Sequence, residues 1–158
     1  HATIRRQRQM CIRDRILDLD IIQSLISKNA IVICCGGGGI PVINKGEYYL
    51  GVPAVIDKDR LSALLAIRMK VDALIISTAI DAVRTGFGTE NEQTHHTMTV
   101  EQANVYLTDG EFPAGSMGPK VASAIEVVES LENVKSIICQ PGDAVKALRG
   151  DSGTNFIK

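Results

Sequence analysis

Four consecutive glycines, Gly36–Gly39, follow directly after the apolar run Ala30–Cys35. A continuous run of this kind, rich in β-branched residues, predicts a strand that is buried on both faces. Glycines at its end can turn tightly and let a ligand approach the backbone, whose N–H groups can then cradle phosphate oxygens. A four-glycine turn that served only as a connection would lose much conformational entropy on folding. We therefore interpret Gly36–Gly39 as a ligand-binding turn rather than a flexible surface turn.

The glycine turn does not match the standard nucleotide-binding fingerprints. Its sequence, CGGGGIP, is neither G-x-G-x-x-G nor a Walker A loop. The dinucleotide-binding and P-loop interpretations are therefore excluded.

A second candidate site is the triplet Asp57-Lys58-Asp59, which an apolar run delivers to the start of a predicted helix. A helix N-terminus carries partial positive charge and free N–H groups, which suit a phosphate. Lys58 would add positive charge to a transferring phosphoryl group, while Asp57 and Asp59 would hold this lysine or help to position Mg²⁺. Taken alone, however, the triplet is better explained as a helix cap with two solvated charges.

A third candidate is Ala114–Lys120, AGSMGPK, another glycine-bearing loop that enters a helix. The helix dipole disfavours a lysine in the first turn, so the position of Lys120 is easier to explain if an anion binds there. A lysine that simply faces solvent is the alternative. Three glycine-to-helix elements, two of them with a lysine, together indicate polyphosphate binding and phosphoryl transfer, which depend on positioning and charge.

Strands and helices are expected to alternate along the chain. Helices are predicted over 16–27, 57–70, 99–107, 119–131 and 143–148; strands over 30–35, 73–77, 134–139 and 154–157; and a hairpin over 41–52, around Asn44-Lys45-Gly46. Residues 78–88 have no clear pattern, and 89–97 are polar and typical of a loop. This alternation predicts an α/β fold with three layers, α/β/α, and a mainly parallel open sheet.

The length, apolar content, net charge and cysteines limit which classes of protein this chain can belong to. The chain has 158 residues, 45% of them apolar, and a net charge of −1, which favours one folded domain and no nucleic-acid or anionic-membrane partner. No apolar run approaches the roughly 20 residues that span a bilayer. The cysteines form no C-x-x-C pair, which favours buried, reduced thiols in a cytoplasmic protein over a zinc site. These cysteines are Cys11, Cys34, Cys35 and Cys139.

We predict no metal site at the histidines and no functional site in the N-terminal residues. His95 and His96 lie near Glu90 and Glu92, where we expect a solvated loop rather than a metal site. Residues 1–15 are arginine-rich and lack the apolar core of a signal peptide. We interpret them as a non-native or disordered tail, similar to translated sequencing-linker sequence. A basic tail and a transit peptide are the alternatives.

Several of these motifs, taken in order, resemble the carbamate kinases of the amino-acid kinase family. The stretches concerned are 33–59, ICCGGGGIPVINKGEYYLGVPAVIDKD, and 110–120, GEFPAGSMGPK, with FGTENEQ at 87–93 and GDSGT at 150–154. The resemblance covers about residues 16–158. It implies reversible phosphoryl transfer between carbamoyl phosphate and ADP, giving ATP and carbamate, with Mg²⁺. It also implies an open, mainly parallel eight-stranded sheet and a homodimer.

The resemblance assigns roles to individual residues. Lys58 and Lys120 would contact the phosphates being transferred, and Asp59 would orient these lysines. Asp57 would line the nucleotide side. The turn residues Gly36, Gly37, Gly38 and Gly39 would border the substrate. The nucleotide and its phosphates would be bordered by Thr78, Asp81, Phe87, Gly88, Met117 and Gly118.

Two departures from the family pattern qualify these roles. Family members are usually about twice as long, and their N-terminal half supplies a G-G-N loop, an H-G-N-G-P loop and a further lysine for carbamoyl phosphate. We therefore expect the chain to be a C-terminal portion that is inactive, or nearly so, by itself, with apolar surface and a strand edge exposed. The second departure is Ala79, where many members have an aspartate. A non-catalytic nucleotide-binding module and an amino-acid kinase with another acceptor are the alternative functions.

Overall fold

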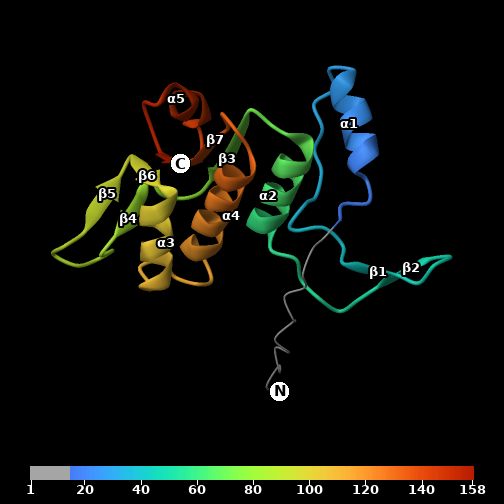
Figure 1. The fold of residues 1–158 in the computed structure, drawn as a ribbon, viewed down its shortest axis with the longest axis horizontal. Coiled ribbons are helices and arrows are strands. Elements are labelled where there is room, and N and C mark those ends of the chain that lie inside the picture. The colour runs from blue at the N-terminus through green and yellow to red at the C-terminus, as the bar shows by residue number, and fades with distance from the viewer. Residues whose placement is uncertain (1–14) are drawn as a thin grey trace. The chain divides into compact units, whose positions relative to one another are not determined.

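The computed structural model describes residues 15–158, and the predicted tail at 1–15 lies almost wholly outside this part of the chain. The chain divides into two compact units, one ending at Leu61 and the other covering Ser62–Lys158. Figure 1 shows their helices and strands in chain order. Each unit is described by itself.

Between residues 15 and 57, the first unit contains one helix and one hairpin, both expected from the sequence. Helix α1 spans Leu19–Ser27. Strands β1 (Val42–Asn44) and β2 (Tyr49–Gly51) pair antiparallel, with Ile43 opposite Leu50. The Asn44 side chain accepts a hydrogen bond of 2.7 Å from the Gly46 N–H, and Gly46 has φ of 89°. Asn and Gly therefore close this turn by the local chemistry that predicted it.

The strand predicted over 30–35 is absent, so this prediction was wrong. The segment has no regular structure, and Ile31 and Ile33 are 97% and 98% exposed. A strand buried on both faces needs hydrogen-bonded neighbours and two covering layers. Among residues 15–158 no strand pairs with this segment. Its apolar pattern therefore lacks the tertiary partners that would make it a strand.

Helix α2 spans Lys58–Met69 and runs from the first unit into the second. One oxygen of the Asp57 carboxylate accepts the backbone N–H groups of Asp59 and Arg60, each at 3.0 Å. These are donors that a helix N-terminus leaves unpaired, so Asp57 is the predicted cap.

The second unit is built on a four-stranded sheet in the order β3-β7-β8-β6. These strands are β3 (Ala73–Ser77), β7 (Lys135–Cys139), β8 (Thr154–Ile157) and β6 (Thr97–Thr99). The pairs β3–β7 and β6–β8 are parallel and β7–β8 is antiparallel. The mainly parallel sheet expected from the sequence is confirmed.

Helices cover both faces of this sheet. On one face Ile76, Ile138 and Phe156 pack with side chains of α3 (Val100–Thr108) and α4 (Met117–Ser130). On the other face Ile137 and Cys139 pack with Ala147 of α5 (Ala144–Arg149). Successive strand residues thus serve opposite layers, as the pleat requires. This confirms the three-layer α/β/α arrangement.

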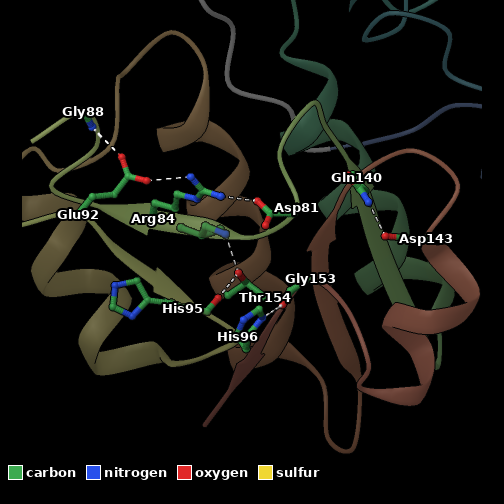
Figure 2. A network of polar contacts seen from close by, with 11 residues as sticks. Asp81, Arg84, Gly88, Glu92, His95, His96, Gln140, Asp143, Gly153 and Thr154 are labelled. Carbon is green, nitrogen blue, oxygen red and sulfur yellow. Dashed lines mark hydrogen bonds and ion pairs between the residues drawn. The ribbon is translucent and has the colours of Figure 1, made fainter.

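The sequence interpretation missed three short strands. It left 78–88 unassigned and expected a loop over 89–97, where β4 (Val83–Thr85), β5 (Gln93–His95) and the start of β6 lie. Strands β4 and β5 pair antiparallel. The wholly buried hydroxyl of Thr154 accepts the Val83 N–H at 2.7 Å and donates to the carbonyl of His95, as Figure 2 shows. Polar tertiary contacts hold this hairpin, so hydrophobic alternation did not reveal it.

Candidate nucleotide and phosphate sites

A pocket of about 530 Å³ opens in the second unit. It lies between the turn that joins β4 to β5 and the loop that joins α3 to α4. Its lining residues are Ile80, Arg84, Gly86, Phe87, Thr89, Asp109, Gly110, Glu111, Phe112, Pro113, Ser116 and Met117. Its volume falls in the usual range for small-molecule sites. Two residues predicted to border a nucleotide, Phe87 and Met117, therefore line one pocket.

The turn beside this pocket is held by a chain of ionic hydrogen bonds (Figure 2). The guanidinium of Arg84 binds Asp81 at 2.9 Å and Glu92 at 2.8 Å. The second Glu92 oxygen accepts the Gly88 N–H at 2.8 Å. Asp81, predicted to border the nucleotide, thus fixes an arginine that lines the pocket. Gly88 is fixed through Glu92.

The carboxylates of Glu92 and Asp81 are both stabilised in the ionised form. The Gly88 N–H, and then Arg84, lower the pKa of Glu92 below 4.5. The backbone N–H of Ala82, and then Arg84, lower the pKa of Asp81 below 3.8. At neutral pH both groups are therefore negative and balance the arginine charge.

One hydrogen bond joins the two walls of the pocket. The Glu111 carboxylate, on the loop between α3 and α4, accepts the Gly86 N–H at 2.8 Å. Gly86 has φ of 59°, and an added Cβ would lie 2.8 Å from the carbonyl oxygen of Asn91. A glycine is therefore needed here for both conformation and space.

The loop before α4 leads to the third predicted site. The carbonyl of Pro113 accepts the N–H groups of Ser116 and Gly118 at 3.1 and 3.0 Å. A Cβ on Gly118 would lie 3.3 Å from that same oxygen. Lys120 follows in the first turn of α4 and is only 8% exposed. Burial contradicts the alternative of a lysine that simply faces solvent.

Thr78 lies at the carboxyl end of β3, where its N–H donates to the carbonyl of Cys139 at 2.9 Å. It is two residues before Ile80, which lines the pocket. Thr78, Gly88 and Gly118 are not themselves among the lining residues of this pocket. Their contact with a nucleotide stays a prediction.

In the first unit the glycine turn packs against the segment before α2. The carbonyl of Cys35 accepts the N–H groups of Gly38 and Gly39 at 3.1 and 2.7 Å. A Cβ on Gly38 would lie 2.0 Å from the carbonyl oxygen of Ile56, whereas one on Gly36 or Gly37 would meet nothing within 4 Å. Gly38 therefore allows the turn to touch the residue that precedes Asp57.

Lys58 and Asp59 are joined directly at the start of α2. The Lys58 ammonium lies 3.1 Å from the Asp59 carboxylate, which is buried, while the lysine side chain is half exposed. The two side chains thus form an ion pair, while the role of Asp59 in orienting Lys58 toward a phosphate stays a prediction. That Lys58 and Lys120 contact the same phosphates stays a prediction, because the two residues belong to different units.

Sequence reasoning missed Arg84, Gly86, Glu92 and Glu111. Opposite charges at Arg84 and Glu92, on either side of the Gly-Phe-Gly turn, were a local signal for their ion pair. Nothing near Glu111 in the sequence pointed to Gly86, because 25 residues separate them. Only the fold brings these two groups together.

The expectation of a solvated histidine loop needs correction. His95 lies in β5, half-buried, with its Nε2 2.8 Å from the Thr85 hydroxyl. Burial lowers the pKa of His95, so the neutral ring is favoured. Within residues 15–158 no cluster of three or more His, Cys, Asp or Glu side chains is arranged to hold a metal ion.

The cysteine prediction is partly confirmed. Cys34, Cys35 and Cys139 are all free thiols. Cys139 is buried, whereas Cys34 and Cys35 are half-buried. Cys11 lies outside the described residues. None of the helices in residues 15–158 has the length and apolar character that crossing a membrane requires.

Known proteins resemble this chain in sequence. The model of the amino acid kinase family matches residues 2–140. A carbamate kinase of Staphylococcus haemolyticus is 44% identical over 139 residues, which make up 88% of this chain and 45% of that protein. A carbamate kinase of Halobacterium salinarum is 42% identical over 142 residues, 90% of this chain and 46% of that protein. The chain spans about half the length of these relatives.

Solved structures agree with this result. The carbamate kinase of Giardia lamblia bound to AMP-PNP superposes with a TM-score of 0.87 at 38% identity, covering 91% of this chain and 50% of that one. A protein of Aeropyrum pernix, project APE1968, gives a TM-score of 0.82 at 35% identity, with 89% and 45% covered. The resemblance expected from the motifs is therefore confirmed.

Proposed function

This chain belongs to the amino acid kinase family, and from that premise we propose that it supplies the nucleotide and phosphate contacts of a carbamate kinase. The reaction is reversible phosphoryl transfer between carbamoyl phosphate and ADP, giving ATP and carbamate. Identity of 44% to a carbamate kinase and a TM-score of 0.87 to one bound to AMP-PNP support this assignment over another acceptor.

The observation that carries the proposal is the pocket between the β4–β5 turn and the α3–α4 loop. Phe87 is 69% exposed at its rim and offers an aromatic face on which a base can stack. Met117 and Pro113 add apolar surface, and Asp109 and Thr89 add polar groups. We place the adenosine half of ADP here, with its phosphates toward the start of α4.

The groups that hold the phosphates act through charge and form no covalent bond with them. Lys58 and Lys120 neutralise the charge of the transferring phosphoryl group, and the N-termini of α2 and α4 add partial positive charge. Asp59 positions Lys58 through the 3.1 Å ion pair. Gly36–Gly39 would border the phosphoryl acceptor. Catalysis then comes from positioning and charge rather than from an enzyme nucleophile.

We propose that Mg²⁺ binds together with the nucleotide. Residues 15–158 contain no three-residue acidic or histidine cluster that would hold the ion alone. Mg²⁺ usually keeps several waters and binds mainly through substrate phosphates and one or two carboxylates. When bound, the ion would neutralise phosphate charge. Asp59 is the carboxylate we expect nearest to it.

Calorimetry with Mg·ADP on the 158-residue chain tests the nucleotide site. We expect binding in the wild type and a loss of at least about tenfold in affinity for Phe87→Ala and for Lys120→Met, because each removes a direct contact. Lys45→Met, at the exposed hairpin turn, is the matched lysine control and should bind as the wild type does. An absence of heat with the wild type, at any ADP concentration up to the millimolar range, would refute the site.

A second candidate, a non-catalytic nucleotide-binding module, is favoured by one observation. All residues that line the pocket belong to the second unit, whereas Lys58 and the glycine turn belong to the first. ATP formation from carbamoyl phosphate and ADP discriminates the two functions. Heat of binding without turnover supports the module, and turnover like that of a full-length enzyme contradicts the predicted inactivity of this chain.

A homodimer of the complete enzyme and a cytoplasmic location stay part of this proposal. Light scattering of a complete protein containing this chain is the measurement that checks the dimer.

A further inference from the structure

Arg84 lines the pocket of the second unit, yet the proposed function gives it no contact with the ligand. It lies in the middle of β4, between Val83 and Thr85, whose side chains are both buried. Because side chains alternate along a strand, the Arg84 side chain projects to the opposite face, where it lines the pocket. A charged group therefore forms part of the pocket wall close to Gly86 and Phe87.

Two ion pairs hold the guanidinium group of Arg84 (Figure 2). Its Nη1 donates to Glu92 at 2.8 Å, and its Nη2 donates to Asp81 at 2.9 Å. Asp81 lies just before β4 and Glu92 just before β5, so the two carboxylates come from different segments. A planar group that is held at both ends loses little further freedom when a ligand binds. The ion pairs therefore preorganise the remaining donors of Arg84.

A third nitrogen of this guanidinium group makes no hydrogen bond to the described part of the protein. Arg84 Nε is buried, and no acceptor in residues 15–158 receives its hydrogen. Leaving a buried donor unpaired is unfavourable, so folded proteins pair nearly all of them. The Arg84 side chain is 31% exposed and lines the pocket. A molecule bound there reaches this side chain, and a slight rotation of the side chain would bring Nε to an acceptor of that molecule.

The charges around Arg84 disfavour a phosphate as this acceptor. Asp81 and Glu92 together outweigh the single positive charge of Arg84, and the pKa of each carboxyl lies below its ordinary value, so both are ionised at neutral pH. Asp109 and Glu111 add two more carboxyl groups to the pocket lining. A phosphate beside Arg84 would face this excess of negative charge. A neutral acceptor, such as a ring nitrogen of a base, meets no such repulsion.

We propose that Arg84 donates a hydrogen bond, through Nε, to a ring nitrogen of the adenine base and so helps to determine which nucleotide binds. Arg84 can do so only if ADP occupies the pocket, so this role rests on the proposed function. Phe87 is 69% exposed and offers its ring to the same base. The aromatic side chain then contacts the face of the base and the arginine contacts its edge.

Calorimetry with analogues of Mg·ADP tests this contact on the wild-type chain, without any substitution. In 1-deaza-ADP, 3-deaza-ADP and 7-deaza-ADP, a C–H group replaces one ring nitrogen of adenine. We expect one of these analogues to bind about tenfold more weakly than ADP, because it loses a hydrogen bond from a charged donor. The other two should bind about as ADP does. Equal binding of ADP and all three analogues would overturn the role of Arg84.

Two substitutions decide whether Arg84 is the donor. Arg84→Met should bind ADP and the sensitive analogue equally. Arg84→Lys keeps the positive charge beside Asp81 and Glu92 but has no Nε, so it should also lose the preference for ADP. Arg149→Met, in the last turn of α5, is the matched arginine control and should keep the preference. Circular dichroism checks the folding of each variant. A preference that persists in both Arg84 variants would show that another group contacts the base.

Adenosine distinguishes a contact with the base from a contact with a phosphate. Arg84→Met should weaken the binding of adenosine and of ADP by the same factor. A loss of affinity for ADP alone would mean that Arg84 binds a phosphate, which contradicts the proposed role. If the wild type binds neither ADP nor adenosine, the pocket is not a nucleotide site, and the proposed function is wrong together with this role. If it binds ADP and the three analogues equally, only the role of Arg84 is wrong.

Discussion

The two units of the chain cover their apolar side chains to very different degrees. In the second unit Ile137 and Ile138 are buried on opposite faces of a sheet, each against helical side chains. In the first unit Ile31 and Ile33 belong to a similar β-branched run, yet they are almost wholly exposed. An apolar run becomes a strand only where neighbouring strands satisfy its backbone and helices cover its faces.

This contrast extends to the candidate sites. The pocket beside Phe87 belongs to the unit with the larger core, and the hydrogen bond between Gly86 and Glu111 joins its walls. The glycine turn and Lys58 belong to the unit in which most of α1 and both strands of the hairpin are exposed. Regions with few buried contacts open more readily. We therefore expect nucleotide binding to be more robust than phosphate positioning.

The largest expected effect is a difference in unfolding free energy between substitutions in the two apolar runs. Ile138→Ala should lower the free energy of unfolding by about 3–4 kcal/mol, because it leaves a cavity in the core. Ile33→Ala should change it by less than about 0.5 kcal/mol, as for an exposed position. Urea unfolding followed by circular dichroism measures both. Equal losses would mean that residues 30–35 are covered in solution. The contrast in burial between the two units would then be wrong.

The second-largest effect is expected from alanine substitution at two glycines of the same turn. Gly38→Ala should cost the turn about 2–3 kcal/mol, because the new Cβ overlaps the Ile56 carbonyl and φ is 135°. Gly37→Ala has open space and should be tolerated. Hydrogen exchange at the Gly39 and Asp59 amides measures the opening of this region. Equal protection in the two variants would show that the turn does not pack on Ile56.

A third prediction concerns the polar contacts that hold the β4–β5 hairpin. Thr154→Val removes the acceptor of the Val83 N–H and the donor to the His95 carbonyl. We expect a loss of about 2 kcal/mol, because one buried and one partly buried backbone group lose their partner. Thr108→Val, where an exposed hydroxyl bonds to Asn104, is the control and should have little effect. Thermal unfolding compares the two, and an equal change in both would contradict the role of Thr154.

The smallest effect is a pH dependence at the edge of the pocket. The folded pKa of Glu92 lies below 4.5, so its contribution to stability is present above pH 4.5 and is lost as the pH falls through the folded value. Protection of the Gly88 amide, corrected for intrinsic exchange, should therefore decrease below pH 4.5. Glu92→Gln should remove this dependence and Glu90→Gln should keep it. A pH-independent Gly88 amide in the wild type would show that the ion pair does not hold the turn.

Features controlled by neighbouring residues were predictable from the sequence. The Asn44–Gly46 turn and the Asp57 cap appear as expected, and the helix predicted from residue 99 begins with a capping box between Thr99 and Gln102. Each depends on a side chain that bonds to the backbone two or three residues away. Helix α4 begins two residues before the predicted start, because the Pro113 turn already directs the chain into it.

Features that depend on distant residues were not predictable in this way. The hairpin of β4 and β5 is held by Thr154, and the pocket walls are joined through Glu111. The expected strand at 30–35 failed for the same reason, since its pattern carried no information about partners.

The sequence by itself determined the family resemblance, the α/β alternation and the lysine- and glycine-bearing motifs, because these depend on residue order and local chemistry. Only the tertiary structure decided which apolar runs are covered and which polar groups meet around the pocket. Burial and long-range hydrogen bonds require two segments to be present together. The four-glycine turn is therefore the clearest motif in the sequence, while the pocket beside Phe87 is the clearest site in the fold.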